Sequence, residues 1–166
     1  MFLLVICCTC SAENQLKSEN GENAVRYWAP QIPESVTFCG ENVNLSNYYL
    51  RERFDRELLS FSYWHSQVFL MIKRANKFFP IIEPILKENG VPEDFKYLAL
   101  IESNLDQRSV SPAKAAGIWQ LLPTTAKEYG LIVNDDVDER YNVEKSTKAA
   151  CDFLKRSYEM TGNWVT

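Results

Sequence analysis

Beyond residue 45, apolar residues recur every three to five positions, and charged residues fill many of the gaps between them. This spacing places the apolar side chains on one face of a helix and predicts a helix over residues 45–61. Its apolar positions are Tyr49, Phe54, Leu58 and Phe61. A second helix is predicted over residues 64–79, ending before Pro80 because proline interrupts helical hydrogen bonding.

The later helices are indicated mainly by the residues that begin and end them. Proline in the first turn, or a serine or asparagine cap, marks a start, and glycine marks an end. These signals predict helices over residues 81–90, 92–103, 111–120, 123–130 and 142–162. Ser111 is the expected cap of the third of these, and Asn142 is the expected cap of the last and longest. The terminating glycines are Gly90, Gly130 and Gly162.

Residues 13–44 lack this helical spacing. They are mostly polar and are interrupted by Gly21, Pro30, Pro33 and Gly40. Such a segment is expected to form an extended arm with weak structure, and we find no convincing alternation that predicts a strand. The expected architecture is one all-α domain over residues 45–166, preceded by this arm.

The first twelve residues form a different kind of segment. Residues 2–8 are apolar, small residues follow up to Ala12, and no Lys or Arg precedes the apolar run. We interpret residues 1–12 as the remnant of a secretory signal peptide cut after Ala12; the alternative is an apolar N-terminus without a targeting role. The run is too short for a transmembrane span. Export predicts a location in the periplasm or cell envelope, with or without membrane association.

Composition narrows the classes of function. The chain is 46% hydrophobic and 13% aromatic, which is enough for one packed core, and its formal net charge is −4. This charge, without a basic run among aromatic residues, argues against nucleic-acid binding. Cys39 and Cys151 have no spacing typical of a zinc site; we expect free thiols, with a disulfide as the alternative. A single histidine, His65, cannot form a metal cluster, so neither a metal nor a cofactor is expected.

One carboxylate interrupts the apolar face of the helix predicted over residues 92–103. At about 100° per residue, Phe95, Leu98, Ala99 and Glu102 lie within roughly 100° of arc. A buried carboxylate without a partner tends to keep its proton, so the pKa of Glu102 is expected above its ordinary value. Such a group can serve as a general acid. From the spacing alone, an outward-facing side chain or a pair with a distant arginine is the favoured alternative.

The motifs that follow Glu102 change this balance. The stretch ALIESNLDQRSVSPAKAAGIWQLLPTTAKEYGL contains Glu-Ser at 102–103, Ser-Pro at 111–112 and Gly-Ile-Trp-Gln at 117–120. In this order they resemble the catalytic core of the lytic transglycosylases that carry a soluble lytic transglycosylase domain, especially those of the membrane-bound murein transglycosylase D type. The similarity extends over about residues 48–166.

The resemblance implies a lysozyme-like helical fold and a reaction on peptidoglycan strands. The bond would be the β-1,4 link between N-acetylmuramic acid and N-acetylglucosamine, and the product would carry a 1,6-anhydro ring. Glu102 would act first as general acid and then as base on the C6 hydroxyl. Ordinary glycosidases use two carboxylates, but this route needs only one. We therefore interpret Asp106, the nearest second acid, as a loop or capping residue, and we expect a monomer.

The resemblance also implies positions that bind substrate. These are Ser103, Ser111, Gly117, Trp119 and Gln120. Gly117 is expected to allow a close approach of backbone. Trp119 would stack on a sugar ring or, as an equal alternative, belong to the core. Asp138 and Arg140 are expected to fix the start of the last helix, and Tyr129 is expected in the core.

Family members continue past the position of Trp164 with another apolar helix and an Ala-Tyr-Asn-x-Gly motif. The present sequence ends at Thr166, so the resemblance implies a C-terminally truncated domain in which Glu102 is partly exposed. Two alternatives to a lytic transglycosylase remain open. One is a hydrolytic lysozyme of the goose type, and the other is a catalytically impaired module that binds peptidoglycan.

Overall fold

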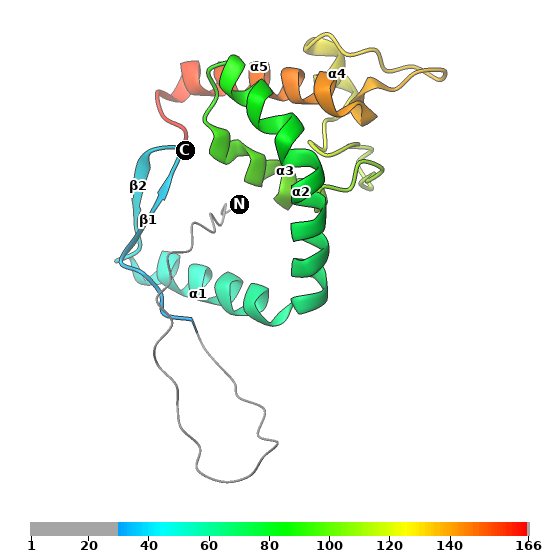
Figure 1. Cartoon of the computed structure of the whole chain (residues 1–166). Helices are drawn as coiled ribbons and strands as arrows, with labels where there is room; N and C mark the ends of the chain where they lie inside the picture. Colours follow the sequence, from blue (N-terminus) through cyan, green and yellow to red (C-terminus); the bar gives the residue numbers. More distant parts are fainter. Residues whose placement is uncertain (1–29, 166) are drawn as a thin grey trace, which may run out of the picture.

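A computed structural model describes residues 30–165 (Figure 1). The predicted leader and the first part of the predicted arm lie outside the described residues. The strands are β1 (Ser35–Phe38) and β2 (Glu41–Asn44). The α-helices are α1 (Tyr48–Tyr63), α2 (His65–Glu88), α3 (Lys96–Ser103), α4 (Pro123–Glu128) and α5 (Val143–Thr161). Short 3₁₀ turns over Glu93–Phe95 and Glu139–Tyr141 precede α3 and α5. The dominance of helix confirms the all-α prediction.

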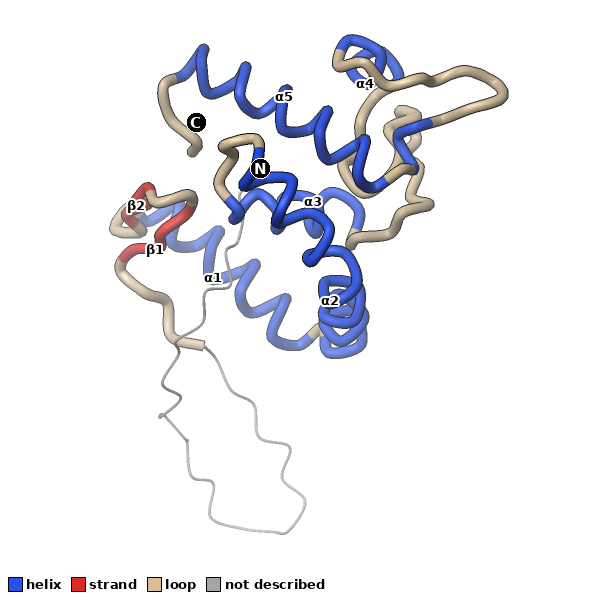
Figure 2. Tube along the Cα trace, turned by 45° about the horizontal axis from the view of Figure 1, so that its top comes forward, coloured by secondary structure: helices blue, strands red, loops and turns tan. Residues whose placement is uncertain are grey.

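Helix α2 connects the two ends of the fold. Helices α3 and α5 pack against it, whereas α1 lies at its N-terminal end, away from α4 and α5 (Figures 1 and 2). The buried side chains of α2 are Met71, Phe78, Ile82, Ile85 and Leu86. Helix α1 buries only Phe54. The main core therefore lies between α2, α3 and α5, the region that holds Glu102.

The prediction that Pro80 separates two helices is wrong. Helix α2 runs through both Pro80 and Pro84 and is 24 residues long, so it, and not the 19-residue α5, is the longest helix. Both prolines lie on the exposed face. Water can satisfy the carbonyl groups that they leave unpaired there, while the opposite face stays buried in the core. Burial of that apolar face outweighs the local cost of each proline.

The prediction of a weakly structured arm is also wrong for its last residues, 35–44. Strands β1 and β2 form an antiparallel hairpin in which Val36 faces Val43. Its two turn residues, Cys39 and Gly40, have φ values of 53° and 79°, as a tight hairpin turn requires. The hairpin is anchored to the core because the Phe38 ring lies edge-on to Phe95, with centroids 5.5 Å apart. Four-residue strands are too short to give a clear alternation.

No helix forms over residues 111–120, where one was predicted. The segment is a series of turns, held by isolated bridges from Ala116 to Val110 and to Leu121. The Ser111 hydroxyl oxygen accepts a hydrogen bond from the amide of Ala115 and closes a turn. Serine followed by proline favours turns as well as helix starts, which explains the error.

The start of α5 and the ends of α2 and α5 agree with the sequence. The side chain of Asn142 accepts a hydrogen bond from the amide of Lys145 and caps α5, and Gly162 ends that helix with φ 75°. After α2, the amide of Val91 donates to the carbonyl of Leu86 across Gly90, the bond expected where glycine terminates a helix. Between residues 30 and 165, no helix is both long and apolar enough to cross a membrane.

Candidate functional site

Glu102 lies in the last turn of α3, as the apolar stripe predicted. Phe95 and Ala99 on the same stripe are buried, Leu98 packs against the core, and Glu102 itself is half-buried. Burial raises the pKa of the Glu102 carboxyl above its ordinary value. Within residues 30–165, Glu102 has no hydrogen-bond or ion-pair partner. The site thus contains a partly dehydrated carboxyl group that favours its protonated form near neutral pH more than a free glutamate does.

The residue after Glu102 joins α3 to the turns that follow. The Ser103 hydroxyl is within hydrogen-bond distance of the carbonyl oxygens of Ala99 (3.1 Å) and Ile118 (2.9 Å). Ser103 is only 7% exposed, so its hydroxyl points into the protein and not toward solvent. Its observed contacts are those of a residue that holds backbone segments together.

A second set of contacts holds the chain just beyond α3. Asn104 and Leu105 both adopt left-handed backbone, with φ values of 52° and 53°, and Leu105 is fully buried. Arg74 of α2 donates hydrogen bonds to the carbonyl of Asn104 (3.0 Å) and to the carboxylate of Asp106 (3.1 Å). Asp106 also accepts a hydrogen bond from the amide of Arg108. These contacts agree with the loop role that was predicted for Asp106.

Gly117 is required by a close approach of two backbone segments. Its φ is 78°, and a Cβ atom there would lie 2.1 Å from the carbonyl oxygen of Arg140. The close approach expected of Gly117 is therefore present, and its partner is the segment before α5. The neighbouring Gln120 side-chain amide donates to the carbonyl groups of Gly117 (2.8 Å) and Ser109 (3.2 Å), and this side chain is partly exposed.

Arg140 connects this turn region with the start of α5. Its guanidinium forms an ion pair with Asp138 at 2.6 Å and donates to the carbonyl groups of Lys114 (2.7 Å) and Leu121 (3.0 Å). The hydrogen bond from Arg140 is the main reason why the pKa of Asp138 is lowered. Arg140 is 7% exposed. The structural role predicted for Asp138 and Arg140 is confirmed.

Trp119 belongs to the core, which is one of the two alternatives left open by the sequence. It is 6% exposed, and its indole nitrogen donates to the hydroxyl of Thr147 at 2.9 Å. A ring in this position has little free face for a sugar, so the burial of Trp119 favours the core alternative. The pattern Gly-Ile-Trp-Gln could not distinguish the alternatives, because a tryptophan in a tight turn can point to either side.

Two of the open hollows on the described surface border elements near the candidate site or α5. The larger, about 470 Å³, is lined by Gln107, Arg108 and Tyr141. It lies directly after the helix that carries Glu102 in the chain, and the Gln107 amide donates to the carbonyl of Tyr141 at 2.7 Å. Sequence reasoning did not identify these three residues, nor Arg74, because loop residues and long-range contacts leave no periodic signal.

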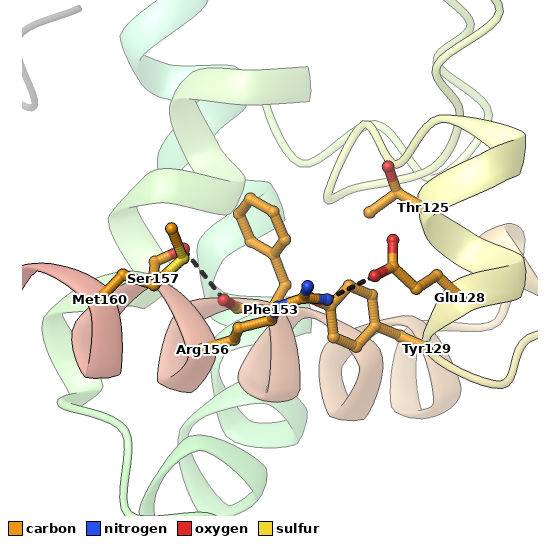
Figure 3. A pocket seen from close by; sticks show the side chains of 7 residues that line it. All are labelled: Thr125, Glu128, Tyr129, Phe153, Arg156, Ser157 and Met160. Carbon is orange, nitrogen blue, oxygen red and sulfur yellow. Dashed lines mark hydrogen bonds and ion pairs between the residues drawn. The ribbon is translucent and has the colours of Figure 1, made fainter.

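The smaller hollow, about 260 Å³, lies between α4 and α5 (Figure 3). Tyr129 packs against the core, as predicted, and also lines this hollow, where its ring lies edge-on to Phe153 at 6.0 Å. Arg156 reaches across from α5 to form an ion pair with Glu128. The cation in this hollow is therefore already paired.

Neither of the two cysteines that the structure describes has the lowered pKa of a reactive thiol. Cys39 and Cys151 are free. Burial raises the pKa of the Cys39 thiol to about 12, with help from Asp94 and Glu41, and burial raises that of Cys151 to about 11. Reactive cysteines need a lowered pKa. Among residues 30–165, no group of three or more His, Cys, Asp and Glu side chains could hold a metal ion.

Comparison with known proteins gives consistent matches. A family model described as "Transglycosylase SLT domain" matches residues 79–166. A membrane-bound lytic murein transglycosylase D of Escherichia coli K12 is 32% identical over 132 residues, which cover 77% of this chain and 28% of that protein. The protein of the same name in Escherichia coli O6:H1 matches equally. A putative tributyltin chloride resistance protein of an Alteromonas species is 29% identical over 92 residues, or 55% of this chain and 44% of that protein.

The chain thus spans 28% of the length of the transglycosylases that it matches. The family match begins within α2 and includes Glu102, the turns over residues 111–120 and α5. It therefore covers Glu102 and the turns around it, though not Arg74, and more than half of the chain. This chain belongs to the transglycosylase SLT domain family, and its helical fold is of the lysozyme-like class.

Proposed function

We propose that this protein is a lytic transglycosylase of peptidoglycan and that Glu102 is its catalytic acid and base. The observation that carries the proposal is the half-buried Glu102 carboxyl, which has no cationic partner among the described residues and a raised pKa. Membership of the SLT family and the names of the Escherichia coli relatives support the choice of substrate. The bond cleaved is the β-1,4 link between N-acetylmuramic acid and N-acetylglucosamine.

The reaction needs two proton transfers, and Glu102 takes part in both. Protonated Glu102 gives its proton to the glycosidic oxygen as the bond from that oxygen to C1 breaks. The Glu102 carboxylate then takes a proton from the C6 hydroxyl of the same muramic residue, and O6 bonds to C1. The products are a free 4-hydroxyl on one strand end and a 1,6-anhydro ring on the other. Glu102 is protonated again, and no water is consumed.

The surroundings of Asp106 favour this route over hydrolysis. A hydrolytic glycosidase uses a second carboxylate to activate water or to attack the sugar. Asp106 is the acid closest to Glu102 in the chain, but one carboxylate oxygen binds Arg74 and the other accepts from the amide of Arg108. An internal nucleophile from the substrate does not require such a base.

Apart from the buried Trp119, the residues predicted to bind substrate then divide into two groups. Ser103 and Gly117 act by holding the backbone around Glu102, since the hydroxyl of one and the Cα of the other contact protein. Ser111 and Gln120 are partly exposed and are the better candidates for hydrogen bonds to sugar. The glycan also contacts the hollow that Gln107, Arg108 and Tyr141 line.

An envelope location follows from this substrate. The apolar residues 2–8 and the small residues up to Ala12 support export, and the Escherichia coli relatives are named as membrane-bound. Fractionation of the native host should recover the protein outside the cytoplasm. Recovery in the cytoplasmic fraction would contradict export.

Zymography on purified cell wall tests the role of Glu102. We expect a clearing zone for the wild-type protein and none for Glu102→Gln, which keeps the size of the side chain but cannot donate the acidic proton. Equal clearing by the two proteins would refute the assignment of Glu102. Binding to cell wall without clearing by either would instead support the alternative of a peptidoglycan-binding module.

A further inference from the structure

Arg74 connects α2 to the segment that leaves α3. Its Nη1 donates to the carbonyl oxygen of Asn104 at 3.0 Å, and its Nη2 donates to Oδ2 of Asp106 at 3.1 Å. The two helices pack against each other and lie side by side in Figures 1 and 2. A cation 30 residues away in the chain thus binds the backbone two residues beyond Glu102.

The C-terminal end of α3 needs such support. The helix has eight residues, fewer than the roughly 12 to 15 that an isolated helix needs for stability in water. The carbonyl groups of its last turn lack partners within the helix. Two consecutive residues with a Cβ atom, Asn104 and Leu105, adopt left-handed backbone there, which is unfavourable for leucine in particular.

The backbone at the end of α3 sets where the half-buried Glu102 side chain begins. No side chain in residues 30–165 forms a hydrogen bond or ion pair with its carboxyl group, so no polar contact would hold its direction if the last turn unwound. Ser103 holds the turn toward Ile118 on one side. Arg74 holds the chain on the other side, through Asn104 and Asp106.

We propose that Arg74 is a positioning residue, which acts through the backbone of Asn104 to hold Glu102 in its catalytic position. The planar guanidinium has donors spaced to bind the carbonyl and the carboxylate at once, whereas a lysine ammonium is a single point charge. Asp106 directs the guanidinium toward the helix end and neutralises it. The inference rests on the role of Glu102 stated above, and it adds a residue outside the sequence motifs.

A merely structural role for Arg74 makes a different prediction. In that case, loss of Arg74 would reduce the fraction of folded protein, but each folded molecule would keep its activity. A positioning role instead lowers kcat of the folded molecules and leaves KM nearly unchanged, because substrate binding does not use Arg74.

The first test measures kcat and KM per folded molecule on soluble murein glycan strands for Arg74→Met and Arg74→Lys. Displacement of a catalytic group by about 1 Å can cost on the order of 100-fold in rate. We expect a kcat loss of up to about 100-fold for Arg74→Met and a smaller loss for Arg74→Lys, with KM nearly unchanged. Arg156→Met is the matched control, because Arg156 pairs only across α4 and α5, and its kcat should stay at the wild-type value.

The second test does not require activity. A carbon-13 NMR titration of the Glu102 carboxyl reports its pKa in each variant. Release of the α3 end exposes Glu102, so the pKa should fall toward the ordinary value in both Arg74 variants. In Arg74→Met, loss of the nearby positive charge would by itself raise the pKa of Glu102. In Arg74→Lys, the charge is kept. A lower pKa of Glu102 in either variant can therefore come only from greater exposure of its carboxyl group.

The outcomes separate this inference from the proposed function. If kcat per folded molecule and the Glu102 titration both match wild type in the Arg74 variants, the positioning role is wrong. If Arg74→Met does not fold, Arg74→Lys gives the same two readings. If Glu102→Gln is as active as wild type, the proposed function fails, while a changed titration in the Arg74 variants still supports the positioning of Glu102.

Discussion

Two carboxylates in this domain have opposite surroundings. Asp138 forms an ion pair with Arg140. The hydrogen bond that the Arg140 guanidinium donates lowers the pKa of the Asp138 carboxyl. Glu102 is half-buried without a partner in the described chain, and burial raises its pKa. The first group is held in its charged form, and the second is shifted toward its neutral form.

The different surroundings of Asp138 and Glu102 distinguish a region with a structural role, around Arg140, from the candidate active site at the end of α3. Each nitrogen of the Arg140 guanidinium donates to a carbonyl or carboxylate oxygen, and the contacts join the turns over residues 111–120 to the start of α5. At the end of α3, the backbone is held by Ser103 and Arg74, while the Glu102 carboxyl has no hydrogen-bond or ion-pair partner between residues 30 and 165. Fixed charges stabilise the backbone around the turns, whereas the function we propose requires a carboxyl group that can exchange a proton with substrate.

The largest expected effect is on catalysis at Glu102. General acid–base groups contribute about 10²–10⁴-fold to rate, so Glu102→Gln should lower kcat by about that factor. Steady-state kinetics on soluble glycan strands would measure it, and circular dichroism would verify the fold. A kcat within a few-fold of wild type would show that Glu102, like Asp138, has no catalytic role.

Removal of the buried cation should have the largest effect on stability. Arg140→Met leaves Asp138 and two carbonyl groups without their donor, and loss of one partner of a buried ion pair costs about 3–5 kcal/mol. Urea denaturation would measure the unfolding free energy. Arg156→Met, which breaks an exposed ion pair, should change it little, and equal losses in both variants would contradict the distinction.

Gly117→Ala tests the close approach between the turns and Arg140. The added methyl group would overlap the Arg140 carbonyl oxygen, and the left-handed backbone adds strain, so we expect a loss of about 3 kcal/mol or more. Gly130 has φ 82° but nothing within 4 Å of a Cβ position. Gly130→Ala should therefore cost only the backbone strain, about 1 kcal/mol. Similar melting temperatures for the two variants would argue against the contact.

The stability contribution of Asp138 should disappear in acid. Because its folded pKa is lowered, its contribution is present above its unfolded pKa of about 3.9 and is lost as pH falls through the lower folded value. Asp138→Asn should thus reduce the unfolding free energy by about 1–2 kcal/mol at neutral pH and hardly at all in strong acid. Denaturant titrations over a pH series would detect it, and a pH-independent difference would disagree.

The smallest expected effect has the opposite sign. The raised folded pKa of Glu102 stabilises the fold below its unfolded pKa of about 4.3, and this contribution is lost as pH rises through the folded value. Glu102→Gln, which stays neutral, should melt at a slightly higher temperature than wild type near pH 7 and at the same temperature near pH 3. A variant that melts lower than wild type at neutral pH would indicate that the carboxylate has a stabilising partner.

Local signals predicted much of the fold. Asn142 and Gly162 bound α5, Gly90 ends α2, and helical spacing placed Glu102 beside Ala99, because caps and periodicity depend on neighbouring residues only. Where these local signals gave a wrong prediction, long-range contacts determined the structure. Pro80 is tolerated since its face of α2 meets water while the other meets the core.

The candidate site was predictable only in part. The motif order identified Glu102 and the constraint at Gly117, but it could not say that Trp119 turns inward to Thr147. The sequence pattern could not predict the contact of Arg74, because 30 residues separate it from its acceptor at Asn104. Such contacts require the fold before they can be recognised.

Mass spectrometry of purified peptidoglycan, digested by the wild-type protein or by Glu102→Gln, would show directly whether Glu102 catalyses lytic cleavage. We expect fragments with 1,6-anhydromuramic ends from the wild type and none from the variant. Fragments with reducing ends, heavier by one water, would show that the protein is a hydrolase. Anhydro ends from both proteins would show that Glu102 is not the acid.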